Sequence, residues 1–131
     1  NSFQRPDAIS PVINCGQIAG MGQLIDQIYV DEKLKEYIVD LIFATRKPDS
    51  YGMDVAEYIE YGASPRASIF LAKAARVNAF LSGRAYITPQ DIKLVGPDVL
   101  RHRIILSFEA EAEDISTDDI IQTLFDSVEV P

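Results

Sequence analysis

The sequence predicts an all-α fold, a small bundle of four or five helices with room for a short two-stranded β-ribbon. Three observations lead to this prediction. Apolar residues recur at helical spacings of three and four along several stretches. Most of these stretches open with a residue that caps helices, and only short connections separate them. No sequence repeat with a fixed period of about 20–50 residues is present, which argues against a solenoid.

The chain is expected to begin with an extended segment over residues 1–13, because this stretch contains two prolines and shows no helical period. A first helix is predicted over about residues 17–27, although two glycines within it lower its helix propensity. Its apolar stripe consists of Ile18, Met21, Ile25 and Ile28.

The second helix has clear signals at both ends. Asp31 is a good N-cap, and Glu32 suits the positive end of the helix dipole. Arg46 and Lys47 complement the opposite end, and Pro48 ends the helix. The apolar stripe between these ends consists of Leu34, Tyr37, Ile38, Leu41 and Ile42.

The third helix is predicted to begin with Ser64 as N-cap and Pro65 as its first residue, and to end before Gly83. Much of its circumference is apolar, so we expect it to be the central helix. One apolar stripe, which spans about 60° of arc, is expected to face the core and consists of Phe70, Ala74, Val77 and Leu81. A second side carries small residues that allow close helix contact, namely Ala72, Ala75 and Ala79.

The fourth helix is predicted to begin at Pro89, with Thr88 as N-cap and Asp91 as the acid of a capping box. Gly96-Pro97 is expected to break or kink it, with a short helical piece after the break. The buried stripe is expected to consist of Ile92, Val95, Val99 and Leu100.

A last helix is predicted after Ser116, which serves as its N-cap, with Asp118 and Asp119 in its first turn. Its apolar face consists of Ile120, Ile121, Leu124, Phe125 and Val128.

Three segments between the helices are expected to be non-helical. Residues 48–63 form a loop, which tyrosines 51, 58 and 61 can hold against the body. Residues 103–110 are β-branched and apolar enough for a short strand, whose partner is expected in residues 27–30. The acidic run over residues 109–114 is expected to be a solvated loop.

The composition excludes several classes of function. The net charge of −8 and the pI near 4.5 argue against general nucleic-acid binding, which needs clustered cations. The single cysteine, Cys15, cannot form an intrachain disulfide and is interpreted as incidental. No stretch has the length and apolar character of a membrane span or a signal peptide. Because the first residue is Asn1, we interpret the chain as a processed product or a piece of a longer protein.

Motifs for self-contained chemistry are missing from the sequence. It has no GxxxxGK[ST] phosphate loop, no GxSxG elbow, no HExxH pair and no Cys/His cluster with zinc spacing. Taken alone, the chain is therefore interpreted as a binding or accessory module, with no metal site.

The cation that attracts attention is Arg66, because a helix start usually carries acidic residues. A guanidinium beside free N–H groups of a first helical turn suits an anion such as phosphate. Lys73 and Arg76 fall with Arg66 within about 80° of arc and make a basic stripe. The alternative interpretation is a surface arginine paired with an acid of residues 54–60.

A second group of cations is Arg101, His102 and Arg103. In a strand their side chains alternate between faces, so one of them is expected to point inward or across an interface. His102 is interpreted as a hydrogen-bonded structural histidine.

Four ordered motifs resemble the C-terminal lid domain of MoxR-type AAA+ ATPases. They are "YIVDLIFATR" over residues 37–46, "GASPRA" over residues 62–67, "SGRAYITPQDI" over residues 82–92 and "VLRHRIIL" over residues 99–106. The resemblance covers about residues 12–131.

The resemblance implies an all-helical lid over residues 14–131, with residues 1–13 as the linker from an ATPase core that carries the Walker A and B motifs. The sequence lacks both motifs, so the chain alone is expected to be inactive and to bind no nucleotide. The parent protein would bind ATP with Mg²⁺. In the family a sensor 2 arginine contacts the γ-phosphate, and the matching residue here is Arg66, with Ser64 and Pro65 beside it at the nucleotide.

The family also implies binding partners and a cellular location. These are the N-terminal AAA+ core of the same chain, neighbouring subunits of a ring that is usually hexameric, and client proteins that include von Willebrand A-domain proteins. A cytoplasmic location and no contact with nucleic acid are expected. Arg46 is assigned a structural or interdomain role. A free-standing helical protein-interaction domain without a nucleotide role stays open as the alternative.

Overall fold

Capping side chains begin several of the helices. In the computed structural model, which describes residues 6–131, Asn14, Asp31 and Ser116 each accept a backbone N–H bond at a helix start. The helices and strands are α1 (Cys15–Asp26), α2 (Glu32–Arg46), β1 (Ile59–Tyr61), α3 (Ala67–Leu81), α4 (Pro89–Leu100), β2 (Ile105–Leu106), α5 (Phe108–Ala112) and α6 (Thr117–Ser127). Two 3₁₀ helices precede β1, namely η1 (Pro48–Tyr51) and η2 (Ala56–Tyr58). The predicted helical bundle with a small ribbon is confirmed.

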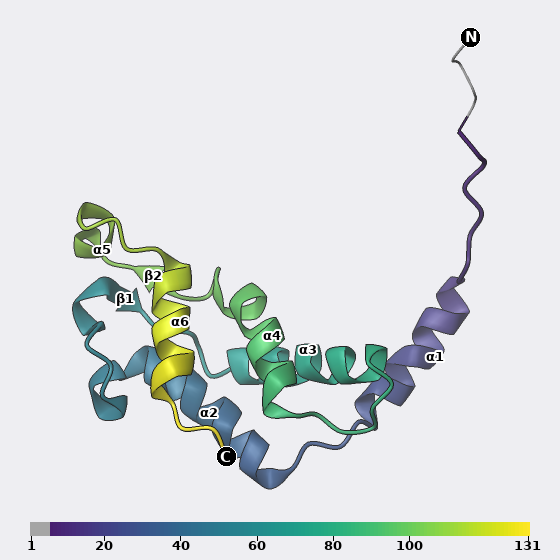
Figure 1. Cartoon of the computed structure of the whole chain (residues 1–131), viewed down its shortest axis with the longest axis horizontal. Coiled ribbons are helices and arrows are strands. Elements are labelled where there is room, and N and C mark those ends of the chain that lie inside the picture. Colours follow the sequence, from purple (N-terminus) through teal and green to yellow (C-terminus); the bar gives the residue numbers. More distant parts are fainter. Residues whose placement is uncertain (1–5) are drawn as a thin grey trace.

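The core lies between four helices. Helix α3 packs on α2 and α4, and α6 also packs on α2 and α4. Figure 1 shows α1 projecting from the far end of α3, with the N-terminal segment continuing away from the body. No residue of α1 is buried. Residues 6–13 are exposed and lack regular secondary structure, whereas the rest of the predicted segment 1–13 lies outside the described residues.

Helix α3 turns a different face to the core from the one predicted. Its buried residues are Ala67, Leu71, Ala75 and Ala79. The larger residues of the predicted core stripe point outward, since Phe70 is 44%, Val77 is 38% and Leu81 is 76% exposed. Both sides of the helix have apolar periodicity, and the small side allows its neighbours to approach closely. The predicted stripe was therefore wrong, whereas the row of small residues does make the close contact at two of its three alanines.

Helix α4 continues through Gly96-Pro97, so of the two predicted outcomes, a break or a kink, the break is wrong. Gly96 is buried against the ring of Phe125 from α6, and a Cβ at this position would lie 2.3 Å from the ring Cζ. This glycine therefore serves close helix packing and does not end a helix. The capping box of Thr88 and Asp91 at the start of α4 is confirmed.

The ribbon forms with a partner that the sequence did not indicate. Strand β2 pairs antiparallel with β1, with Ile59 opposite Leu106. The segment expected as its partner, residues 27–30, instead lies beside the loop before α4. There the N–H of Tyr29 donates to the carbonyl of Ala85 at 2.8 Å. The partner of β2 depends on where the end of α4 places this segment in the fold, and the local sequence does not reveal that position.

The acidic run is partly helical, because the hydroxyl of Ser107 caps the short helix α5. Its carboxylates are exposed, as expected. The loop before β1 is held down by two of its tyrosines. The hydroxyl of Tyr51 donates to Asp40 at 3.0 Å and that of Tyr58 donates to Glu113, whereas Tyr61 stays exposed. Among residues 6–131, no helix has the length and apolar character needed to cross a membrane.

Candidate functional site

Arg66 lies at the start of α3 with its side chain exposed. It has helical backbone angles, and the helix proper begins at Ala67, two residues later than predicted. Within residues 6–131 it forms no ion pair and no side-chain hydrogen bond, so the alternative pairing with an acid of residues 54–60 is not realised. The guanidinium is therefore available to an external anion.

The first turn of α3 is tighter than an α-helical turn. The N–H groups of Ala67 and Ser68 donate to the carbonyls of Ser64 and Pro65, at 2.9 Å and 3.2 Å. The side chain of Ser64 makes no capping bond within the described residues, which corrects the predicted N-cap. Because these donors are used internally, an anion at this helix start would depend mainly on the guanidinium of Arg66.

The segment before Arg66 is fixed to the last turn of α2. The buried hydroxyl of Thr45 donates to the carbonyl of Ile42 at 2.6 Å and accepts the N–H of Ala63 at 3.0 Å. The Arg46 guanidinium donates to the carbonyl of Ala63 at 3.3 Å. Arg46 therefore has a structural contact, and the backbone three residues before Arg66 is held from both sides.

Gly62 makes this attachment possible. A Cβ at this position would lie 2.3 Å from the carbonyl oxygen of Thr45, which is too close for any side chain. Gly62 thus lets the backbone of this segment pack directly on the backbone of α2 at Thr45. The residues that follow, Ser64 to Arg66, begin from this held position.

The predicted basic stripe separates into residues with different surroundings. Lys73 is exposed, whereas the Nε of Arg76 donates to the carbonyl of Ile28 at 3.1 Å and ties α3 to the segment after α1. Both line an apolar groove of about 310 Å³ between α2 and α3, and Arg66 does not. A smaller apolar hollow of about 150 Å³ adjoins the start of α3 and is lined by Val39, Ile42, Phe43, Arg46, Pro65 and Ser68.

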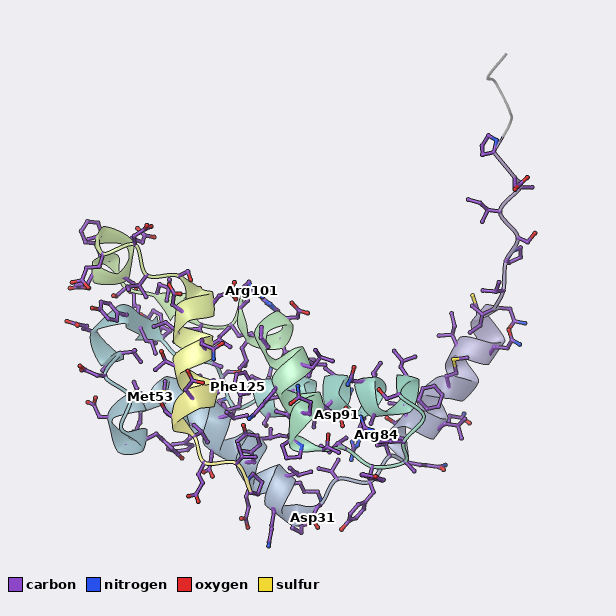
Figure 2. The ribbon with its side chains drawn as sticks, viewed as in Figure 1. Asp31, Met53, Arg84, Asp91, Arg101 and Phe125 are labelled. Carbon is purple, nitrogen blue, oxygen red and sulfur yellow. The ribbon has the colours of Figure 1, made fainter. Side chains whose placement is uncertain are left out.

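The sequence indicated only the capping box of Thr88 and Asp91, which is one part of a larger polar cluster that joins the end of α3 to the start of α4. Asp91 is 1% exposed, and Arg84 binds its two oxygens at 2.6 Å and 2.7 Å (Figure 2). Asn78 donates to the same carboxylate at 2.7 Å, as does the N–H of Thr88. Burial acts to raise the pKa of Asp91, but the hydrogen bonds from Arg84, Thr88 and Asn78 outweigh it and lower the pKa to about 2.

The cations after α4 lie in a turn and not in a strand. Arg101 pairs with Asp98 at 3.0 Å and with Asp118 at 2.9 Å. His102 is exposed and makes no side-chain hydrogen bond within the described residues, so its predicted structural role is wrong. Arg103 is the residue that turns inward, and its guanidinium lies 4.4 Å from the centre of the Phe70 ring.

The fold and this site define a small helical domain with an exposed arginine, unpaired within residues 6–131, at the start of its central helix, which also leaves its larger apolar residues exposed. Residues 52–124 match the family described as the AAA lid domain. The chain belongs to this family.

Relatives agree with this assignment. The chain is 39% identical to Chaperone MoxR1 of Mycobacterium tuberculosis over 96% of this chain and 34% of that protein. It is 34% identical to Protein MoxR of Methylorubrum extorquens over 79% of this chain and 32% of that protein. A crystal structure of a proposed ATPase from Cytophaga hutchinsonii superposes with a TM-score of 0.86 at 45% identity, over 88% of this chain and 36% of that one.

The chain spans about a third of the length of these relatives. Together with the fold, they show that it is a lid module of the MoxR type of AAA+ ATPase, as the four motifs indicated.

Proposed function

We propose that this lid couples ATP binding and hydrolysis in its parent protein to chaperone-like remodelling of partner proteins, with Arg66 as the sensor 2 arginine. The parent protein is the full-length ATPase that contains this chain. The observation that carries the proposal is the exposed guanidinium of Arg66, which has no acidic partner within residues 6–131 and extends from a fixed backbone.

The residues at this helix start fit a phosphate group. A guanidinium presents a planar fork of N–H donors that matches the oxygens of a phosphate. Ser64 and Pro65 are exposed beside it, so Ser64 can add a hydroxyl and Pro65 a rigid surface at the nucleotide. Within the described residues no cluster of His, Cys, Asp or Glu could hold a metal ion, so the proposal assigns Mg²⁺ and most of the phosphate contacts to the ATPase core.

The mechanism then follows from charge. While the γ-phosphate is present, Arg66 is drawn to it, and the lid is held against the core. Charge that develops on the transferring phosphoryl group would be stabilised by the same guanidinium. When hydrolysis removes the γ-phosphate, this attraction is lost and the lid is free to move. Because the backbone before Arg66 is fixed to α2, the lid responds as a body.

The exposed apolar residues of α3 favour the lid hypothesis and argue against the alternative of a free-standing interaction domain. Phe70 and Leu81 lie on the same side of the helix as Arg66 and are largely exposed in this chain. Large apolar side chains that gather on one face mark an interaction surface. We propose that the N-terminal ATPase core covers this face when Arg66 meets the nucleotide.

The proposal also includes the assembly and the client proteins of the parent protein. Subunits of the parent protein would assemble into a ring in the cytoplasm, and its clients would include proteins with von Willebrand A domains. The name of the Mycobacterium tuberculosis relative describes that protein as a chaperone, which is in line with such work.

The test is the variant Arg66→Ala in the parent protein. ATP turnover should fall by on the order of 10-fold or more, because the variant loses a charge that stabilises the transition state. Arg101→Ala is the matched control, since it removes an exposed arginine whose partners lie within this chain. Turnover should then be nearly normal. Normal turnover in Arg66→Ala would remove the sensor assignment.

A further inference from the structure

Arg103 differs from the neighbouring Arg101 in its surroundings. Arg101 is neutralised by carboxylates on α4 and α6. Arg103 has no ion pair within residues 6–131, and its Nε is buried without a hydrogen-bond partner there. A half-buried guanidinium without an acid is unusual in a chain with a net charge of −8.

An aromatic ring holds Arg103 in place. Its guanidinium carbon lies 4.4 Å from the centre of the Phe70 ring, well within the range of a cation–π contact. The ring holds the guanidinium on one face, and within residues 6–131 its N–H groups make no hydrogen bond, so they can bind an external acceptor. Phe70 therefore orients the cation without neutralising it.

Phe70 links Arg103 to the helical turn that begins with Arg66. The N–H of Phe70 faces the carbonyl of Arg66 at 3.4 Å, so the two residues are one helical turn apart in α3. Side chains at this spacing are neighbours, with about 5–6 Å between their Cβ atoms. The chain thus places two arginines from distant parts of the sequence along one side of the start of α3. Neither has an acidic partner within the described residues.

We propose that Arg103 is a second phosphate-binding arginine of this lid and that Phe70 positions it. The inference rests on the proposed function, since it assumes that a nucleotide lies over this end of α3. With two guanidinium groups, the lid distinguishes a triphosphate from a diphosphate, because the additional phosphate supplies charge and oxygens for both. A single arginine would favour the triphosphate less strongly.

The experiment measures the affinity of the parent protein for ATP-γ-S and for ADP. Arg103→Ala should weaken ATP-γ-S binding by on the order of 10-fold, while ADP binding changes by less than about 3-fold. Phe70→Leu should reproduce part of this loss, since it keeps an apolar side chain but removes the ring. The control Arg101→Ala should preserve both affinities. A purely structural role of Arg103 would instead lower both affinities alike, and that result would overturn the inference.

Arg66→Ala separates the inference from the proposed function. If Arg66→Ala loses turnover and triphosphate selectivity while Arg103→Ala behaves as wild type, the second arginine is rejected and the sensor stands. If both variants behave as wild type, both proposals fall. Should Arg103→Ala not fold, Arg103→Gln keeps the side-chain stem over Phe70 and removes the charge. Unchanged selectivity in that variant overturns the inference.

Discussion

Gly62 lies directly against the carbonyl oxygen of Thr45, and this contact sets the point from which the segment carrying Arg66 leaves α2. Gly62→Ala should destabilise the chain by about 1–3 kcal/mol, because a Cβ 2.3 Å from that oxygen forces the backbone apart. Denaturant unfolding of the 131-residue chain measures the loss. The control is Gly20→Ala in α1, where a Cβ meets nothing within 4 Å and helix propensity improves. Equal stability of Gly62→Ala and wild type would show that the contact is not tight.

Asp91 is the buried end of the polar cluster that joins α3 to α4. Asp91→Asn should destabilise the chain by about 2–4 kcal/mol, because it leaves the Arg84 charge without its partner and disturbs the capping bond to Thr88. Thermal or denaturant unfolding gives the value. Asp98→Asn is the matched control, because that carboxylate is exposed and its pairing with Arg101 contributes little. A similar loss in the two variants would contradict a special role for the buried acid.

The same carboxylate predicts a loss of stability in acid. The pKa of Asp91 is lowered from 3.8 to about 2 in the folded chain, so its stabilising contribution is complete above about pH 4 and is lost as the pH falls through 2. The shift corresponds to about 2 kcal/mol. Unfolding curves between pH 5 and about pH 2 should therefore show wild type approaching Asp91→Asn in stability. A constant difference between them across this range would be inconsistent with the lowered pKa.

Gly96 and Phe125 form a second close packing point, between α4 and α6. Gly96→Ala should cost about 1–3 kcal/mol, since its Cβ would lie 2.3 Å from the ring. The double variant Gly96→Ala/Phe125→Leu should recover part of that loss, because the smaller side chain makes room for the methyl group. Unfolding free energies of the two single variants and the double variant form the cycle. Strict additivity would show that the two residues do not limit each other.

The isolated 131-residue chain should not bind ATP with micromolar affinity. One helix start with two arginines supplies too few contacts without the phosphate loop, which this sequence lacks. Calorimetric titration of the chain with ATP provides the measurement. A micromolar dissociation constant would contradict the division of the site between lid and core.

Local rules predicted much of the fold. The ends of α2 and the capped starts of α4 and α6 follow from Asp31, Pro48, Asp91 and Ser116, because caps and proline act within a few residues. The core face of α3 was not predictable in this way. Apolar residues line both of its sides, and only contact with α2 and α4 decides which side is buried.

In the candidate site too, local features could be predicted from the sequence, whereas contacts between distant residues could not. Arg66 could be found from the sequence, since a cation at a helix start conflicts with the dipole. The hydrogen bond between Thr45 and Ala63 joins residues 18 positions apart. The contact of Arg103 with the Phe70 ring joins residues 33 positions apart. No local pattern in the sequence signals either contact. Glycines gave a misleading signal, because Gly96 looked like a break and proved to be a packing contact.

Helix α3 is anchored at both ends, by Thr45 before its first turn and by the cluster of Arg84 and Asp91 after its last. Its 15 residues make a rod of roughly 22 Å. A tilt of about 10° at the arginine end would displace the opposite end by about 4 Å over that length. The exposed helix α1 rests near that opposite end, so a tilt of the whole domain about the arginine end would displace α1 further than Arg66.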